Sequence, residues 1–456
     1  MLPFQTFTPG SQQEYFSDGL TEEMITQLGG LNPERLGVIA RTSAMHYKGT
    51  SETARQIGQE LGVEYLVEGS LRREGSRVRI SAQLIRVRDQ MHLWAQDYDR
   101  DFSDYLAMQN DVARDIAAQI QLKLSAQPSR ASRPLNAAAY DANMKGRYFW
   151  NKRSEQGYLK AIEYFEQAIA ADPNYAQAYS GLADAYALLG SNPTRATTRK
   201  EAMSKARDAA LKALSLDDTL AEAHTSLAFV YWHYDWNWPA AEKEFQRALQ
   251  LNPSYPTAHH WFAFYLVSQG RTDQALEEIR RAQQADPLSL IINTDVAQML
   301  YFAHRYDQAI EQARRVLEMD PEFALAHVML AWSYHARHEN EAALEEAKKA
   351  AVPANRGGMD ANLAIFYALT DQRTMAHDVL LHIKLASEKL HTEELSTGIA
   401  QIYAALGDND QAFAWLEKDL ENRNGGLTLI KVLPFLDSLH SDPRFADLVR
   451  RIGLPQ

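Results

Sequence analysis

The feature that most constrains this 456-residue chain is a repeat in its second part. Asp-Pro or Asn-Pro pairs end at Pro253, Pro287 and Pro321, so two successive steps of 34 residues separate them. An earlier pair at Pro173 lies 80 residues before Pro253, which fits two repeats plus an insertion of about 11 residues at Ser191–Glu201. A regular period of this length indicates short units stacked in a row rather than one closed globule.

The apolar residues of each unit predict two helices packed against each other. Small residues recur where the two helices would touch, as at Ala241 and Ala275, and large residues follow four positions later, as at Phe245 and Ile279. Spacings of three and four residues place these side chains on one face of a helix. Proline closes each unit because it cannot continue the second helix.

This pattern resembles the tetratricopeptide repeat (TPR) family, in which each 34-residue unit is a helix pair. The resemblance implies an all-α TPR solenoid, a right-handed superhelix of about eight repeats over residues 137–433, with a capping segment over residues 434–456. Residues 127–136 are polar and contain two prolines, so we interpret them as a linker.

In the family that these repeats resemble, the first helices line a concave groove through positions 2, 5, 9 and 12 of each repeat. Aromatic side chains occupy several of these positions in the middle repeats, and such side chains are common anchors for peptides. The predicted partner-binding groove consists of Phe229, Trp232, His260, Phe264, Gln298, Tyr301, Trp332 and His335. Packing between repeats is the alternative role of these rings. Trp232→Ala and Trp332→Ala should weaken partner binding in the first case and unfold the array in the second.

Residues 1–126 mix strand and helix patterns and predict an α/β domain. We expect a hairpin at Glu74-Gly75-Ser76, where a turn signal separates two alternating segments. The strands are expected at residues 2–7, 36–41, 63–75, 76–89 and 92–100, and the helices at 17–31, 51–62 (capped by Ser51) and 104–124. An arginine cluster around the hairpin (Arg72, Arg73, Arg77, Arg79, Arg86, Arg88) is expected to pair with Glu64, Glu68 and Glu74, with an acidic partner or the acidic repeats as alternatives.

The runs EYFSDGLTEEMITQL, LGVIARTSAMHYKG and ARQIGQELGVEYLVEGSLRREGSRVRISAQLI resemble the TolB-like amino-terminal domain. In bacterial signalling proteins that domain precedes a TPR array and typically follows a winged-helix DNA-binding domain or a class III adenylate cyclase domain. Neither effector is present in this sequence. We therefore expect a stand-alone regulatory module or a module whose upstream effector or membrane segment lies outside the sequence.

Composition disfavours several functions. The 47 basic and 59 acidic side chains leave a net charge of −12, which argues against direct binding to nucleic acid or to an anionic membrane. Cysteine is absent, so disulfides, thiolate nucleophiles and cysteine-ligated metals are excluded. The longest apolar runs are far shorter than a membrane span, and no N-terminal signal is visible. We expect a cytoplasmic protein, or a periplasmic one if it derives from a longer membrane-anchored chain.

No catalytic motif stands out. The run from Asp97 to Asp104 starts like a calcium loop but has Phe102 where the loop needs glycine, so we predict no metal site. No phosphate-binding loop, nucleophile elbow or metalloprotease motif is present, and we predict no cofactor and no enzymatic activity. The sequence predicts a non-catalytic interaction scaffold, the regulatory part of a bacterial signalling or transcription-regulating system, that binds a protein or peptide in the TPR groove. The alternatives are a small-molecule or glycan sensor at the domain junction and an accessory part of an adenylate cyclase. The sequence names no oligomeric state.

Overall fold

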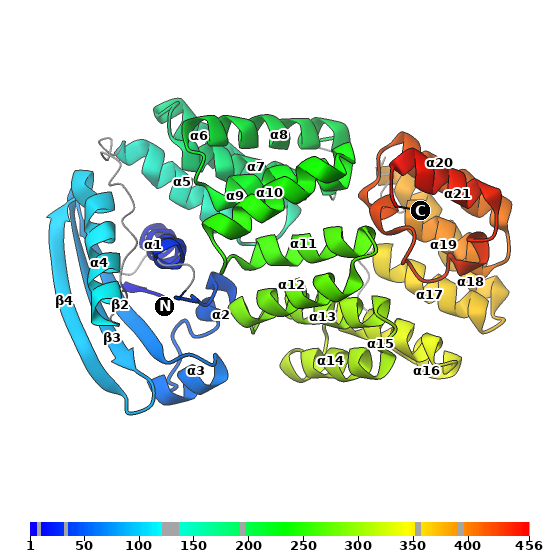
Figure 1. Cartoon of the computed structure of the whole chain (residues 1–456), viewed down its shortest axis with the longest axis horizontal. Coiled ribbons are helices and arrows are strands. Elements are labelled where there is room, and N and C mark those ends of the chain that lie inside the picture. The colour runs from blue at the N-terminus through cyan, green and yellow to red at the C-terminus, as the bar shows by residue number, and fades with distance from the viewer. Residues whose placement is uncertain are drawn as a thin grey trace.

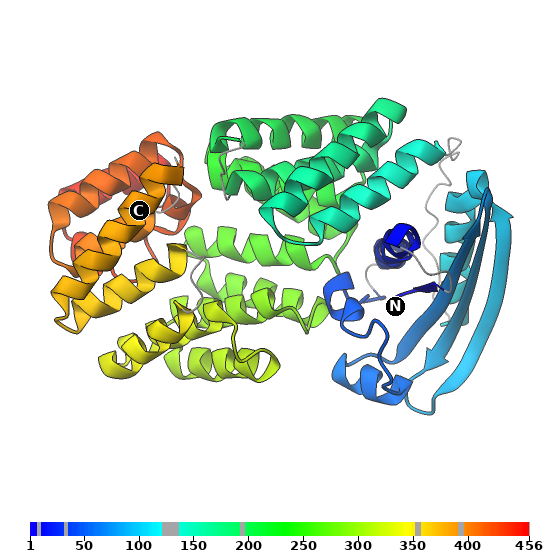
Figure 2. The same cartoon turned by 180° about the vertical axis from the view of Figure 1, so that it is seen from behind.

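The computed structural model describes residues 1–6, 11–31, 35–120, 136–191, 197–351, 357–390 and 396–455. An α/β domain lies at one end of the molecule, and helix pairs extend from it to a C-terminal helical group at the other end (Figures 1 and 2). The predicted linker lies outside the described residues except for Asn136, as does the centre of the predicted insertion.

The α/β domain contains a four-stranded sheet of order β1-β2-β3-β4. β1 runs parallel to β2, and the other neighbours are antiparallel. The strands are β1 (Gln5–Thr6), β2 (Tyr65–Glu74), β3 (Arg77–Arg86) and β4 (Met91–Asp101). The predicted hairpin is confirmed, because Glu74 pairs with Arg77 across a turn in which Gly75 has a φ of 61°.

Two long helices cover the sheet face that carries Val78, Ile80 and Leu84. They are α1 (Ser11–Leu31) and α4 (Tyr105–Gln119), which follows the short η1 (Phe102–Asp104), and α1 lies between the sheet and the helical repeats (Figure 1). The shorter α3 (Ala54–Glu60) contacts β2. Its cap is Thr53, which forms a capping box with Gln56, so the prediction of Ser51 as the cap was wrong.

The strand predicted at residues 36–41 is absent, and this segment leads instead into α2 (Arg41–Met45). The Ala40 amide donates to the Ala285 carbonyl of the repeats at 2.7 Å, so its backbone hydrogen bond lies outside the sheet. The apolar side chains of this segment pack against the cores of the α/β domain without joining the sheet: Leu36 and Val38 contact one cluster and Ile39 the other.

The arginine cluster takes other partners than the glutamates that we expected. Arg77 and Arg79 both pair with Asp99 on the neighbouring β4, and Arg86 pairs with Asp89. The strand register explains the two ion pairs with Asp99, because Arg79 lies directly opposite Asp99 in the sheet. Arg73 instead reaches Asp141 of the repeats at 3.6 Å.

The second part of the chain consists of TPR helix pairs, as predicted. The pairs are α5 (Ala137–Trp150) with α6 (Glu155–Ala171), α7 (Ala176–Ser191) with α8 (Arg199–Leu216), α9 (Ala221–Val230) with α10 (Trp238–Leu251), α11 (Pro256–Ser268) with α12 (Thr272–Ala285), α13 (Leu290–Phe302) with α14 (Tyr306–Met319), α15 (Ala324–Ala336) with α16 (Asn340–Ala350), α17 (Gly357–Leu369) with α18 (Arg373–Leu390), and α19 (Ser396–Ala405) with α20 (Asn409–Glu421). The alanines of the repeat pattern are fully buried between paired helices, as at Ala241 and Ala275. Thus the 34-residue period corresponds to one helix pair.

The second helices end at equivalent positions, at Asp172, Asp217, Asn252, Asp286 and Asp320. The steps between them are 45, 35, 34 and 34 residues, so one repeat carries a single extra residue besides the insertion before α8. That repeat contains η2 (Tyr231–Asp235), a turn of π-helix after α9. A π turn is how a helix accommodates one added residue, and here it precedes Trp236 in the left-handed region, with φ 55°.

The C-terminal segment folds back on this π turn. It contains η3 (Gly425–Leu429), η4 (Asp437–Leu439) and α21 (Pro443–Ile452). Arg423 donates to the Tyr234 and Asp235 carbonyls at 3.3 and 3.2 Å, and the Trp238 indole donates to the Ile452 carbonyl at 3.2 Å. The last residues therefore close against the middle of the array rather than against its last repeat alone.

Candidate functional site

The predicted groove residues divide into two groups by exposure. Phe229, Trp232 and Trp332 are 5%, 4% and 8% exposed, and their rings pack in the core of the repeats. The partly exposed members are His260, Phe264, Gln298, Tyr301 and His335. In this conformation the three buried rings serve packing between repeats, and the other five side chains keep part of their surface exposed.

A ring from the C-terminal segment lies over the far end of this groove. The Phe435 ring centre is 6.3 Å from that of Trp332 and 5.3 Å from that of His335. Phe435 adopts a φ of 68°, which is uncommon for a residue with a side chain. The C-terminal half of the predicted aromatic groove is therefore covered by the chain itself.

A large cavity lies elsewhere, at the junction between α1 and the first repeats. Its volume is about 1260 Å³, and we call it the junction chamber. Position 2 of four successive first helices lines it, and α1 closes the opposite side. These position 2 residues are Gln177, Glu222, Thr257 and Ile291. The chamber is thus the N-terminal part of the concave face, roofed by the α/β domain.

Two charged side chains of the chamber lining, Arg147 and Glu222, interact with each other and with Asp184, which is not a lining residue. Arg147 of α5 donates to Asp184 of α7 at 2.6 Å, and Ser226 donates to the other oxygen of the same carboxylate. Burial raises the pKa of Asp184 against the opposing effects of Arg147 and Ser226. Burial also raises the pKa of Glu222, and Arg147 again opposes it.

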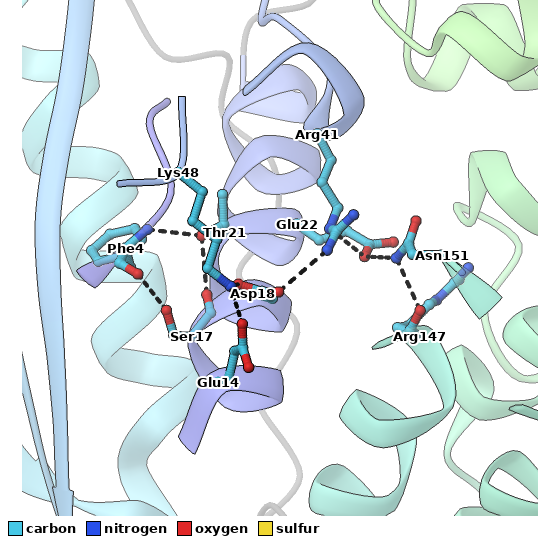
Figure 3. Close-up of polar contacts among 10 residues, drawn as sticks. All are labelled: Phe4, Glu14, Ser17, Asp18, Thr21, Glu22, Arg41, Lys48, Arg147 and Asn151. Atoms are coloured by element: carbon cyan, nitrogen blue, oxygen red, sulfur yellow. Dashed lines mark hydrogen bonds and ion pairs between the residues drawn. The ribbon is translucent and has the colours of Figure 1, made fainter. Parts of the chain in front are cut away.

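Polar contacts from α1 connect the two parts of the molecule (Figure 3). Asn151 of α5 donates to Glu22 at 2.8 Å, and Arg41 lies 3.6 Å from the Glu22 and Asp18 carboxylates. Lys48 donates to Asp18 at 2.7 Å. Figure 3 shows this chain of contacts running from α1 to the end of α5. The chamber wall is therefore held by side chains of both parts.

Another carboxylate of the chamber lining, that of Glu23, belongs to α1. Glu23 accepts hydrogen bonds from Gln109 of α4, at 2.7 Å, and from Tyr140 of α5. Burial raises the pKa of Glu23 to about 7, although both hydrogen bonds favour the charged form. This group joins three helices and changes charge near neutral pH.

Several buried polar atoms that line the chamber have no hydrogen-bond partner within the described residues. They are Gln27 Oε1, Arg41 Nε, Asn143 Oδ1, Trp150 Nε1 and Ser180 Oγ. Asn143 and Ser180 are 3% and 1% exposed. Buried polar atoms are satisfied in most folded proteins, and unsatisfied ones gathered around a cavity indicate a place for a polar ligand.

Ser180 and Asp184 occupy positions 5 and 9 of their repeat, which are groove positions in the TPR family, but they are not among the aromatic residues that the sequence singles out. No local signal brings Arg147 and Glu22 to them, because Arg147 lies 37 residues before Asp184 and Glu22 lies 129 residues before its partner Asn151. Within the part of the chain that the structure describes, no group of three or more metal-ligating side chains is found. The described helices include none that is long and apolar enough to span a membrane.

The geometry defines a class of protein: an α/β domain followed by a TPR solenoid that shares a chamber with it. Comparison with family models agrees with this architecture. Residues 149–196, 237–289 and 297–358 match the tetratricopeptide repeat model. Residues 1–117 match the model of the second domain of HilA/YgeH-like transcriptional regulators. The resemblance of this region to the TolB-like domain stays a prediction.

A protein named "Putative adenylate cyclase 3" from Rhizobium meliloti (strain 1021) is 37% identical over 185 residues. The match covers 40% of this chain and only 31% of that relative. The chain therefore spans less than a third of the relative that it resembles, and the activity in the relative's name is not transferred to it.

Solved structures share the helical-repeat fold. Pseudomonas aeruginosa pilF is 19% identical with a TM-score of 0.35, and the match covers 46% of this chain and 93% of that one. YrrB, described as a TPR protein with an unusual peptide-binding site, is 24% identical with a TM-score of 0.31, over 41% and 91% of the two chains. The human IFIT1 dimer with m7Gppp-AAAA is 16% identical with a TM-score of 0.46, over 70% and 79%. All three TM-scores are below 0.5, so no function of these proteins is transferred to this chain.

Proposed function

We propose that the chain is a non-catalytic interaction scaffold whose TPR superhelix binds a peptide or protein segment at the junction chamber and along the groove beside it. The observation that carries this function is the chamber itself, which lies on the concave face and is lined by buried polar atoms without partners. The partly exposed His260 lines it as well, so the chamber continues into the predicted groove. TPR arrays commonly present such concave faces to their partners.

The regulatory context is part of the same proposal. The match to a transcriptional-regulator domain and the relative named as an adenylate cyclase both support a role beside an effector in a bacterial signalling system. In this proposal, binding in the chamber changes the position of α1, and the α/β domain passes this change to the effector. The helix α1 suits this role because it forms one wall of the chamber and also packs on the sheet.

Selection of peptides on the purified full chain tests the proposal. A phage-displayed random dodecapeptide library would be panned against it, and the selected peptides measured by fluorescence polarisation. Gln177 lines the chamber but is exposed, so Gln177→Trp should narrow the opening without disturbing the core and should weaken binding at least about tenfold. Gln167→Trp, at an exposed position of α6, is the matched control. Equal binding by both variants would contradict the proposal.

A small-molecule or glycan sensor is the second candidate, and the enclosed position of the chamber between two parts of the chain favours it. Thermal-shift screening of the full chain with metabolites and oligosaccharides tests this candidate. A stabilising compound whose effect disappears in Gln177→Trp would support the sensor function over peptide binding.

A further inference from the structure

On the basis of the proposed function, we infer that the junction chamber binds a cationic side chain, the ammonium of lysine or the guanidinium of arginine, of the partner segment. The recognition elements are the carboxylate of Glu222 and the unpartnered acceptors of Asn143 and Ser180.

The charge inside the chamber is unbalanced. The lining contains more acidic than basic side chains: Glu22, Glu23, Asp172, Asp217, Glu222 and Asp286 against Arg41, Arg147 and Arg153. The guanidinium of Arg147 interacts with the carboxylates of Glu22 and Glu222 and with that of Asp184, which is not itself a lining residue. Asp184 takes the direct contact at 2.6 Å, and Glu22 has Asn151 and Arg41 as further partners. Within the described residues, no side chain donates a hydrogen bond to Glu222, whose partly exposed carboxylate accepts one from its own backbone N–H. The excess of carboxylates in the lining therefore favours a ligand that brings positive charge.

The unpartnered acceptors of the lining fit the same chemistry, whereas Trp150 Nε1 and Arg41 Nε are donors that a cation does not satisfy. Asn143 lies one helical turn before Arg147 on α5, and Ser180 lies one turn before Asp184 on α7. Asn143 Oδ1 is an acceptor, and so is Gln27 Oε1 on the opposite wall. Ser180 Oγ can accept as well. An ammonium has three N–H donors and a guanidinium has five, so either group can satisfy several of these acceptors at once.

The size of the chamber indicates that the cation is attached to a longer ligand. A cavity of about 1260 Å³ exceeds the volume of one side chain. Its lining also includes the aromatic residues Tyr158, Tyr255 and Trp261, which can contact the neighbouring residues of an extended peptide. The cation then fixes the register of the bound segment.

A double-mutant cycle tests the inference: the charge is removed from the peptide, from residue 222 of the full chain, or from both. Each selected peptide that contains arginine would be resynthesised with citrulline, which keeps the shape of the side chain and removes its charge. We expect the exchange to weaken binding to the unmodified chain on the order of tenfold or more, and to change binding to Glu222→Gln less than about twofold. Glu277→Gln, at an exposed position of α12, is the control and should behave like the unmodified chain. Butylguanidinium and butylamine are the free-cation probes, and competition by either would show that a free cation suffices.

Three results would overturn the inference: selected peptides without a basic residue, equal binding of the arginine and citrulline peptides, or an undiminished citrulline effect in Glu222→Gln. In each of these cases, loss of binding in Gln177→Trp would still support the proposed function. Retention of binding in Gln177→Trp would contradict the proposed function as well.

Discussion

At the residue scale, one buried serine links the α/β domain to the repeats. Ser43 is fully buried, and its amide and hydroxyl both donate to Asp286, at 2.9 and 2.6 Å. Its hydroxyl also accepts from the Leu288 amide at 2.8 Å. Burial raises the pKa of Asp286, and the bonds from Ser43 oppose this effect. Ser43 thus provides hydrogen-bond partners for the Asp286 carboxylate and the Leu288 amide, which lie more than 240 residues further along the chain.

Ser43→Ala should lower the free energy of unfolding by about 1–3 kcal/mol, because it leaves the Leu288 amide without an acceptor and removes one donor to Asp286. Urea unfolding followed by circular dichroism measures the change. Ser51→Ala removes a hydroxyl at an exposed position and should have little effect. Equal stability of the two variants would show that the contact contributes nothing.

Glu23 gives the protein a pH-dependent stability. Its pKa is about 7 in the folded protein and 4.5 ordinarily, so the folded state retains a proton that the unfolded state releases. The contribution of this group to the free energy of unfolding is complete below pH 4.5 and falls as the pH rises to about 7, by about 3 kcal/mol at most. The Glu23→Gln side chain cannot ionise. Between pH 5 and pH 8 the free energy of unfolding of this variant, measured by urea titration, should therefore fall less than that of the unmodified chain. Parallel pH profiles for the variant and the unmodified chain would refute this role.

At the scale of elements, a recurring cross-link holds the first helix to the second helix in four successive repeats, from α9–α10 to α15–α16. His259 contacts Glu278 through Nδ1, at 2.5 Å, and the Pro253 carbonyl through Nε2, at 2.8 Å. The same contacts recur as His224 with Glu244 and Asp218, Asn293 with Gln312 and Pro287, and His327 with Glu346 and Pro321. The positions on the first helix follow the repeat period and can be found in the sequence. Their partners on the second helix cannot, because the two side chains meet only when the two helices pack against each other.

The docking of η3 on η2 is the element contact that closes the array. A Cβ at Gly425 would lie 1.8 Å from a ring atom of His233, whose pKa burial lowers to about 3. Gly425→Ala should therefore cost about 1–3 kcal/mol and loosen the C-terminal segment. Hydrogen exchange should accelerate in residues 231–238 and 423–439. Gly30→Ala, where the added Cβ meets nothing within 4 Å, is the control, and the same exchange pattern in both variants would argue against the docking role.

At the scale of the whole molecule, the two parts share a core. Tyr140 and Met144 of α5 are 0% and 1% exposed and belong to the hydrophobic core of the α/β domain. The contacts of Ser43 add a second connection further along the array. The first repeat is therefore complete only when α1 packs against α5, and the roof of the junction chamber follows from this packing.

A chain that begins at residue 137 should expose these two side chains. We expect it to bind a hydrophobic dye such as ANS and to melt at a lower temperature than the full chain, because an apolar patch loses its cover. The doubly substituted short chain with Tyr140→Gln and Met144→Lys should bind less dye. A short chain that melts at the same temperature as the full chain and binds no dye would show that the parts are independent.

The sequence by itself determined the repeats, since a 34-residue period of small and large residues requires helix pairs that bury each other's apolar faces. It also determined the β2–β3 hairpin, because Gly75 in the turn and alternating residues on either side are local signals. Only the tertiary structure decided where the concave face stays open. The cover of Phe435 over Trp332, and the meeting of Glu22, Arg147 and Glu222, depend on how distant segments pack. Such contacts leave no periodic pattern along the chain, since each is made once.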